Sequence, residues 1–336
     1  MLKIAVDAMG GDNAPEEIVK GAVLASSELS QLELILVGDS VRLNNLLAKY
    51  NSPSNIKVQH STQVIGMNES PVQAIREKKD ASINVAIEQV KLGHAAAVVS
   101  AGNTGAFMAG ALFKLGRIPG VERPAIATLF PTGGEKVLLL DMGANSDNKP
   151  HHLQQFGEMG SLYAEHIMHV NKPRVGLLNI GEEKEKGNEL TQAAWELLSK
   201  SPHINFIGNV ESKDIMSGKV DVVVCDGFVG NLVLKLSESV AYKILDLLKH
   251  EIKRSLLAKI GALFLLPAFK NLSKQIDYDE YGGALLLGVN GVCIKAHGRA
   301  KAKAIKNSIR VAYESLQEDI VECIKKEENI QKVENQ

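Results

Sequence analysis

The chain has 336 residues, of which 45% are hydrophobic and 4% aromatic, and its 38 Lys and Arg nearly balance its 39 Asp and Glu. This length and apolar content allow a large folded core and exclude a disordered chain, while the balanced charge and scarce aromatic rings argue against nucleic acid as a partner. Its three cysteines are widely separated and form no CxxC pair, so we expect no disulfide framework, no zinc site and a cytoplasmic location.

The N-terminal third alternates apolar strands with amphipathic helices, the pattern of a parallel α/β sheet. Asp12 or Asn13 is expected to cap the first helix, which has Pro15 in its first turn. The sequence places strands at 2–7, 32–38, 56–60 and 95–100, and helices near 41–49, from Pro71 onward and at 82–92.

The remaining chain continues this alternation with one interruption. Two adjacent strands, AIATLF and KVLLLDM, are joined through Thr-Gly-Gly, which indicates a hairpin within an otherwise parallel plan. A long helix at 229–259 then leads into the apolar segment GALFLLPAF. We expect one α/β domain over 1–330, with a helical, partly apolar excursion at 240–280, a final helix at 300–326 and a frayed polar tail at 331–336.

Five apolar strands end in turns rich in Gly, Asn and Asp. If these strands are parallel, all five turns meet at one edge of the sheet, where helix N-termini present unpaired backbone N–H groups. Such an edge favours bound anions. The five stretches are 4–15, 95–112, 137–147, 175–189 and 222–235.

The sequence lacks several common catalytic motifs, namely Gly-x-Gly, GxxxxGK[ST], HExxH and GxSxG. Among the remaining candidates, Lys186 abuts Gly-Asn at a predicted helix start and is placed to bind an anion, whereas Lys184 is expected in a solvated turn. His297 follows an apolar strand and can bind an anion, donate a proton or fill a polar position in the core. A solvated helix explains the histidines at 151, 152, 166 and 169, so no metal site is predicted.

The motifs VDAMGGDNAP, SAGNTGA, LDMGAN, NIGEE with KGNE, NFIGNVE, VVVCDGFVGN and YGGA with KAHG occur in this order between residues 5 and 298. This series closely resembles the bacterial phosphate acyltransferases of the PlsX type. The resemblance implies transfer of a long-chain fatty acyl group from acyl carrier protein to inorganic phosphate, giving acyl phosphate for phospholipid synthesis without cofactor or metal. It also implies a homodimer and a three-layer α/β/α fold with a mostly parallel sheet, like that of phosphotransacetylases and the isocitrate dehydrogenase group.

Two positions depart from the pattern of that family. His151 stands where the family usually has an acidic residue, and Arg299 and Ala300 stand where it usually has two serines, which puts a role for hydroxyl groups there in doubt. The chemistry agrees with the residues independently. Phosphate is already anionic and needs no strong general base, so the site must position it and stabilise a tetrahedral oxyanion.

These arguments predict a set of site residues. The predicted catalytic residues are Lys186, His297, Asn231 and Asp226. The predicted substrate and phosphate ligands are Asp7, Gly10, Gly11, Asn103, Thr104, Gly105, Asp141, Asn145, Glu183, Asn188, Asn209 and Gly227. The alternatives are a short-chain phosphotransacetylase that uses coenzyme A and a non-catalytic membrane scaffold for acyl carrier protein. A decarboxylating dehydrogenase is disfavoured, because no aspartate cluster for a divalent metal is evident.

Two surfaces of the chain are expected to meet larger partners. Acyl carrier protein is acidic, and its docking residues are predicted at Lys249, Lys253 and Arg254, with the start of the last helix (Arg299, Lys301, Lys303, Lys306 and Arg310) as the other candidate. The apolar residues Leu263, Phe264, Leu265 and Leu266 are predicted to contact the inner face of the membrane peripherally. Pro267 is expected to end the preceding helix near Leu266, and burial of this segment against a partner subunit is the alternative.

Overall fold

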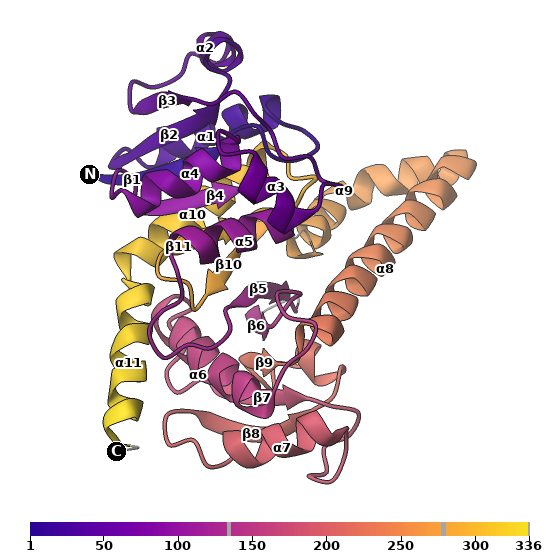
Figure 1. Cartoon of the computed structure of the whole chain (residues 1–336). Coiled ribbons are helices and arrows are strands. Elements are labelled where there is room, and N and C mark those ends of the chain that lie inside the picture. The colour runs from indigo at the N-terminus through magenta and orange to yellow at the C-terminus, as the bar shows by residue number, and fades with distance from the viewer. Residues whose placement is uncertain (133–135, 277–279, 335–336) are drawn as a thin grey trace.

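The computed structural model describes residues 1–132, 136–276 and 280–334. Its described strands form one 11-stranded sheet in the order β3-β2-β1-β4-β11-β10-β5-β6-β9-β7-β8 (Figure 1). The strands are β1 (Leu2–Asp7), β2 (Leu32–Gly38), β3 (Ile56–His60), β4 (Ala97–Ser100), β5 (Ala125–Pro131), β6 (Lys136–Leu140), β7 (Arg174–Leu178), β8 (Asn205–Val210), β9 (Val222–Val224), β10 (Ala284–Leu287) and β11 (Val292–Lys295).

Helices cover both faces of the sheet, so the predicted three-layer α/β/α architecture is confirmed. Central strands are apolar on both faces; in β1, for example, Ile4 and Val6 belong to one core and Ala5 to the other. One core is covered by α1 (Glu16–Glu28), α2 (Ser40–Lys49), α6 (Pro150–His166), α7 (Glu189–Leu198), α10 (Ala302–Gln317) and α11 (Ile320–Glu334). The other is covered by α3 (Pro71–Glu77), α4 (Ser82–Lys91), α5 (Thr104–Lys114) and the short helix η1 (Asp214–Met216).

The direction of the strands reverses in the middle of the sheet. The predicted hairpin is confirmed, because β5 pairs antiparallel with β6, although its connecting residues 133–135 lie outside the described residues. Since β10 is antiparallel to both β11 and β5, the strands β6, β9, β7 and β8 run opposite to β1–β4 and β11. The five glycine turns therefore do not leave one edge of the sheet, because β6, β7 and β9 run opposite to β1 and β4. Even so, residues of four of the turns, Asp12, Thr104, Gly143 and Asn231, line a common cavity.

Three local predictions also change. Neither Asp12 nor Asn13 caps α1, since the residue before its first turn is Pro15 and makes no side-chain cap; Asn13 instead donates to the carbonyl of Arg299 at 3.0 Å. The predicted last helix is two helices, α10 and α11, separated at Asp319, which has a positive φ of 47° that breaks the helical path. Helix α11 continues to Glu334, through most of the segment expected to fray.

Two helices project from the body of the molecule and form an arm (Figure 1). We define the arm as α8 (Gly227–Arg254) and α9 (Leu256–Ile276). It confirms the expected excursion but begins earlier in the chain than residue 240. Pro267 lies inside α9, so the prediction that it ends the helix is wrong; proline removes a single intrahelical hydrogen bond, and the helix continues on both sides of it. Among the described residues, no helix is long and apolar enough to cross a membrane.

Candidate functional site

The turns that follow β1, β4 and β11 interlock into a single platform. The carboxylate of Asp7 accepts a hydrogen bond from the Ser100 hydroxyl at 2.7 Å, and the Asp12 amide donates to the Gly298 carbonyl at 2.8 Å. A Cβ on Gly10 would lie 2.8 Å from the backbone of Gly102, so only glycine allows the first two turns to approach this closely. Of the predicted residues, Asp7, Gly10 and Gly11 therefore build this platform.

Lys295 ends β11 within the platform, and its side chain is buried. Burial lowers the pKa of Lys295 to about 8, and the carboxylates of Asp7 and Asp12 partly oppose that effect. Its ammonium group donates to the carbonyl of Ala296. A buried lysine without an adjacent ion pair is costly to fold, and perturbed groups of this kind are common in functional sites.

Lys295 lines a cavity of about 750 Å³ between the platform and the first half of α8. The polar end of this cavity carries two hydroxyls, one amide and several charged groups, contributed by Asp12, Thr104, Thr128, Asn231, Lys235, Lys295, His297 and Arg299. On α8 the carboxylate of Glu238 also lines the cavity, and the residues that line it beyond Glu238 are Ala241, Tyr242 and Leu245, which with Leu234 supply its apolar surface. One cavity thus joins charged groups to an apolar channel toward Leu245, which suits a ligand with an anionic head and a hydrocarbon tail.

Three of the predicted residues line the polar end together, namely Thr104, Asn231 and His297. The Nδ1 atom of His297 accepts the Arg299 amide proton at 3.1 Å, so in the neutral ring the proton is on Nε2. This arrangement gives His297 a free N–H donor near the cavity. Asn231 lies on the first turn of α8, against Gly143, whose positive φ of 114° lets the turn after β6 reach the cavity.

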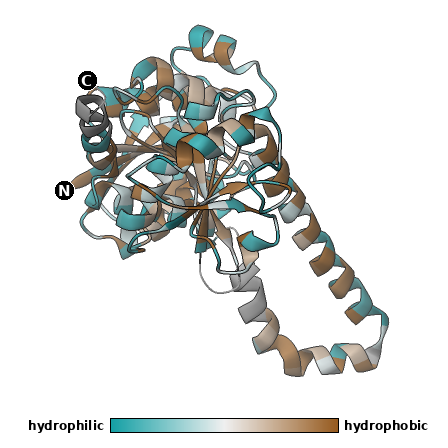
Figure 2. Cartoon of the chain, turned by 90° about the horizontal axis from the view of Figure 1, so that it is seen from below, coloured by the Kyte–Doolittle hydropathy of each residue, from teal (hydrophilic) through white to brown (hydrophobic). Residues whose placement is uncertain are grey.

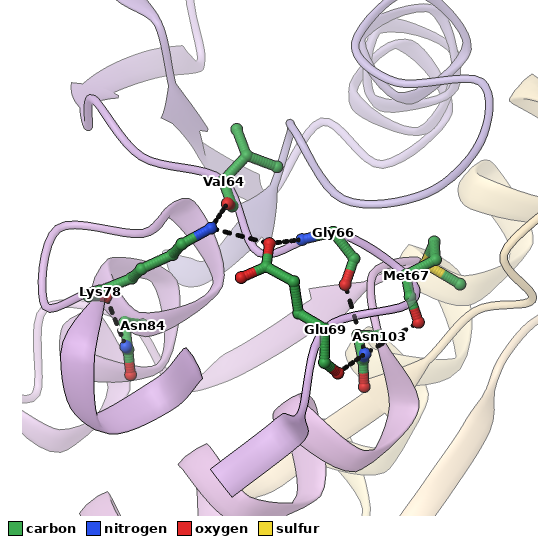
Figure 3. Close-up of polar contacts among 7 residues, drawn as sticks. All are labelled: Val64, Gly66, Met67, Glu69, Lys78, Asn84 and Asn103. Atoms are coloured by element: carbon green, nitrogen blue, oxygen red, sulfur yellow. Dashed lines mark hydrogen bonds and ion pairs between the residues drawn. The ribbon is translucent and has the colours of Figure 1, made fainter. Parts of the chain in front are cut away.

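Asn103 is one of the predicted ligands, but all of its hydrogen-bonding groups are used by the protein itself. Its Nδ2 donates to the carbonyls of Gly66, Met67 and Glu69 at 3.3, 3.0 and 3.2 Å, and its Oδ1 caps α5 by accepting the Ala106 amide proton (Figure 3). Asn103 therefore holds the loop 64–69 in place and leaves Thr104 as the member of its turn that faces the cavity.

The loop 64–69 forms one wall of the cavity through Met67. Glu69 fixes it by accepting from the Gly66 amide at 2.6 Å and from Lys78 Nζ at 2.7 Å, while Lys78 also donates to the Val64 carbonyl at 3.0 Å (Figure 3). The ion pair lowers the pKa of Glu69, so its carboxylate is ionised at neutral pH. This network gives Met67 a defined position in the wall of the cavity.

The turn after β6 supports the other side of the cavity. Asp141 is buried and accepts hydrogen bonds from the amides of Ile126, Ala144 and Asn145 at 3.0, 2.9 and 2.7 Å, and from Asn145 Nδ2 at 2.9 Å. Burial raises the pKa of Asp141, and these four donors oppose the shift. A Cβ on Gly227 would lie 2.4 Å from the Asn145 carbonyl oxygen, so this predicted glycine is needed for α8 to dock on the turn.

Asp226 caps α8 by accepting the Val229 amide proton at 2.9 Å. Asp141, Asn145, Asp226 and Gly227 thus position Asn231 and the apolar face of α8. In the described structure they perform that supporting function, and their polar groups point at the protein backbone rather than into the cavity.

Five predicted residues lie elsewhere in the fold. Gly105, on the first turn of α5, packs against Pro71. Glu183, Lys186 and Asn188 lie in the loop between β7 and α7, and Asn209 lies on β8; none of the four lines the cavity. Asn188 caps α7 through Thr191, and Asn209 donates to the Glu183 carbonyl at 2.7 Å.

Lys186 is exposed with its stem over Gly181, whereas Lys184 forms an ion pair with Glu196 at 2.5 Å and lies 4.4 Å from the centre of the Trp195 ring. The structure therefore separates this charged loop from the Lys295 cavity. The loop follows β7, which lies beyond β9 in the sheet and is further from β11 than the strands β6 and β9, whose following residues line the cavity.

One cluster among the described residues brings three possible metal ligands together. The ligand atoms of Glu122, His151 and His152 lie within 4.8 Å of one another. However, His152 Nδ1 accepts the Lys149 amide proton at 3.0 Å, which places the ring proton on Nε2, the atom that faces Glu122 at 3.4 Å. A metal ion bound to Nε2 would displace that proton to Nδ1. However, Nδ1 already accepts the hydrogen bond from the Lys149 amide. The cluster is better explained as a charged cap of α6.

Comparison with known proteins agrees with the motifs and the fold. A family model described as "Fatty acid synthesis protein" matches residues 2–323. The chain belongs to this family. Its curated relatives include a "Phosphate acyltransferase" of Halothermothrix orenii, 51% identical over 98% of this chain and 99% of the relative. Another, from Desulfitobacterium hafniense, is 54% identical over 97% of both chains.

Solved structures support the same fold class for this member of the fatty acid synthesis protein family. A phosphotransacetylase from Streptococcus pyogenes superposes with a TM-score of 0.63 over 94% of both chains at 15% identity. The "EutD phosphotransacetylase from Staphylococcus aureus" gives a TM-score of 0.58 at 17% identity, covering 93% of this chain and 94% of that one. At these identities the likeness establishes the fold alone.

Sequence reasoning missed Lys295 as a site residue of this family member. The lysine is visible in the KAHG motif, but the prediction singled out His297, two residues later. A signal was present, since a lysine that directly follows the apolar run VCI at a strand end must be buried or paired. Lys235 was also missed; it lies one helical turn after Asn231 on α8, so the two side chains share a face.

Proposed function

We propose that the Lys295 cavity is where this phosphate acyltransferase moves a long-chain fatty acyl group from an acyl carrier protein thioester to inorganic phosphate. The observation that carries the assignment is the continuity of one cavity from a cationic end, with Lys235 and Lys295, to an apolar channel along α8. Phosphate fits the first and the acyl chain fits the second.

The proposed reaction uses the groups of the polar end in defined roles. A phosphate oxygen attacks the thioester carbonyl, and the Lys295 and Lys235 ammonium groups offset the negative charge of phosphate and of the tetrahedral oxyanion. Thr104 and Asn231 donate hydrogen bonds that fix the orientation of the reactants. The C–S bond then breaks, and His297 Nε2–H is placed to donate a hydrogen bond to the sulfur of the departing thiolate, which takes its proton from water.

The test of this function is phosphate-dependent release of free thiol from acyl carrier protein, together with acyl phosphate formation. The same assay with short-chain acyl coenzyme A separates the function from that of a short-chain phosphotransacetylase. We expect the long-chain carrier thioester to be preferred, because the channel beside Leu234, Ala241 and Leu245 would be left partly empty by a short chain. Turnover that is equal for both donors would favour the alternative, and no turnover with either would favour the non-catalytic scaffold.

Binding of phosphate or an oxyanion by Lys186 remains a separate proposal. Lys186 is exposed and is not ion-paired among the described residues, so it can bind phosphate or an oxyanion, but it would do so at the end of β7. Glu183, Asn188 and Asn209 shape that loop. A function for Lys186 in the same reaction requires that its loop complete a site with other parts of the assembled protein.

The exposed apolar residues of the arm support both a homodimer and peripheral membrane contact. On α8, one apolar stripe repeats every fourth residue and is 48–67% exposed, comprising Phe228, Leu232, Leu236, Val240 and Ile244. A stripe of this length is typical of a helix–helix interface, and we propose that it pairs with a second copy of the chain. Figure 2 shows hydrophobic segments along both helices of the arm.

The predicted membrane residues are distinct from that stripe. Leu263, Phe264, Leu265 and Leu266 are four consecutive positions that are 46–82% exposed, so they surround α9 rather than forming one face. A helix that is apolar on every side suits insertion into the headgroup boundary better than a single protein contact. We therefore propose that α8 forms the dimer and that this part of α9 touches the inner face of the membrane.

The predicted docking residues for acyl carrier protein lie further along the same arm. Lys249, Lys253 and Arg254 are exposed, and Arg254 pairs with Glu251 at 3.1 Å. The other candidate patch is largely neutralised, since Lys303 and Lys306 form ion pairs with Glu280 and Glu28. Docking at Lys249 stays a prediction; that residue follows the cavity residue Leu245 by one helical turn.

A further inference from the structure

A second cavity, of about 940 Å³, adjoins the first at the same end of the sheet. It lies where β6, β7, β8 and β9 begin, between the end of α6 and the face of α10. Leu129 and Tyr281 line both cavities and form the wall between them. The two cavities therefore adjoin at Leu129 and Tyr281.

The second cavity is amphipathic. Tyr163, Ile167, Leu129 and Val311 supply apolar surface. Two of its cationic side chains, Arg174 and Arg310, lie beside carboxylates of the protein itself. Arg174 is held by Asp221 through two hydrogen bonds of 2.9 and 2.8 Å, and Arg310 lies 3.7 Å from Glu314.

Two further cations of this cavity are not neutralised in this way. Lys136 and Lys172 are exposed, and neither forms an ion pair with any described residue; the Lys136 Nζ atom lies 5.6 Å from the centre of the Tyr281 ring. These two lysines are therefore available to an incoming anion. The carboxylates of Glu314 and Glu318 also line the cavity, so it favours a single localised negative group over a broad acidic surface.

The geometry of a thioester decides how such a cavity could be used. The acyl chain and the prosthetic arm leave the thioester carbon and sulfur in opposite directions. If the acyl chain occupies the channel along α8, the prosthetic arm must leave the polar end by another route. The wall formed by Leu129 and Tyr281 lies on that route, because Tyr281 precedes β10, whose residue Ala284 pairs with Lys295.

We infer that the phosphopantetheine arm of the carrier protein enters through the second cavity, with its phosphodiester between Lys136 and Lys172 and its thioester beyond the Leu129–Tyr281 wall. This inference rests on the proposed function of the Lys295 cavity. The phosphodiester supplies the single localised negative charge that the two lysines favour, and the amide-rich arm can cross a wall of mixed polarity. Docking on the α10 side of the body is therefore the alternative to the arm docking predicted at Lys249 and Lys253.

The test compares three donors in the double variant Lys136→Glu, Lys172→Glu. Acyl carrier protein and acyl-phosphopantetheine both carry the phosphate, whereas acyl-pantetheine carries the same thioester without it. We expect KM to rise about tenfold or more for the two phosphate-bearing donors, as expected for losing charged hydrogen bonds, and to be unchanged for acyl-pantetheine. The matched control is the double variant Lys20→Glu, Lys79→Glu, which makes the same charge change at two exposed lysines that line neither cavity and should leave all three values unchanged.

Several results would overturn the inference. They are an unchanged KM for acyl carrier protein, an equal loss with acyl-pantetheine, or the same loss in the control variant. Failure of the proposed function has a different signature, because wild-type protein would then form no acyl phosphate from any of the three donors. The two lysines are exposed, so their replacement should leave the unfolding transition of the protein unchanged.

Discussion

Replacing Lys295 with methionine separates the chemical role of this residue from its effect on folding. Methionine is of similar length and fills the same buried space without a charge. Loss of a charged donor to phosphate and oxyanion should lower kcat/KM about a hundredfold or more. The effect on stability should be the opposite of that for an ordinary core substitution, because the native fold holds the ammonium in an unfavourable environment.

The size of the stability effect follows from the pKa. Burial lowers the pKa of Lys295 from 10.5 to about 8, a difference of 2.5 (10.5 − 8). At about 1.36 kcal/mol per unit, the folded state disfavours the protonated form by roughly 3 kcal/mol at pH 7. The variant avoids this cost, so its free energy of unfolding at pH 7 should equal that of the wild type or exceed it by up to about 3 kcal/mol.

The pH dependence has a definite sign. Between pH 8 and 10.5 the unfolded chain binds the Lys295 proton and the folded chain does not, so wild-type stability rises with pH in that window. Below pH 8 both states are protonated, and this residue contributes no slope. The stability difference between variant and wild type should therefore narrow from pH 8 to 10.5. Activity that needs the charged ammonium should fall above about pH 8 in the wild type.

Urea denaturation at pH 7 and pH 10 and the phosphate-dependent thiol assay measure the two effects. Lys235→Met is the matched control, because Lys235 lines the same cavity but is exposed, and its replacement should lower activity without the pH-dependent stability change. Wild-type activity in Lys295→Met would refute the role of this lysine in the reaction. A variant destabilised by several kcal/mol at pH 7 would show that the ammonium is structural.

Three further predictions concern other parts of the molecule. Lys186→Ala should lower acyl transfer about a hundredfold if its loop binds phosphate, whereas Lys184→Ala should have a mild effect; normal turnover in both would confine the reaction to the Lys295 cavity. Replacing Leu263 and Leu266 with Glu should abolish sedimentation with anionic vesicles while size-exclusion chromatography still shows a dimer, and conversion to monomers would instead identify a subunit interface. Asn103→Ala should lower the free energy of unfolding by about 1 to 3 kcal/mol, since it removes the α5 cap and leaves three carbonyls of the loop 64–69 without their donor; an unchanged urea midpoint would contradict this.

The sequence alone determined the local elements and their class. Periodic apolar residues located β2 at its observed bounds, and the Thr-Gly-Gly between two apolar runs indicated the β5–β6 hairpin. These predictions succeed because strand and helix burial follow from residues close together in the chain. The same holds for the arm, whose length and exposed apolar residues follow from its helical pattern.

Only the tertiary structure decided which strand ends meet. Local periodicity does not specify the direction of pairing between distant strands, so the reversal at β10 and β5 was not visible and the five glycine turns were wrongly placed on one edge. Likewise, Asn103 and Thr104 are adjacent polar residues at one helix start, and only the packed loop 64–69 shows that the first is used by the backbone. Lys295 became a site residue for the same reason, because burial by distant segments, and not its neighbours in sequence, sets its pKa.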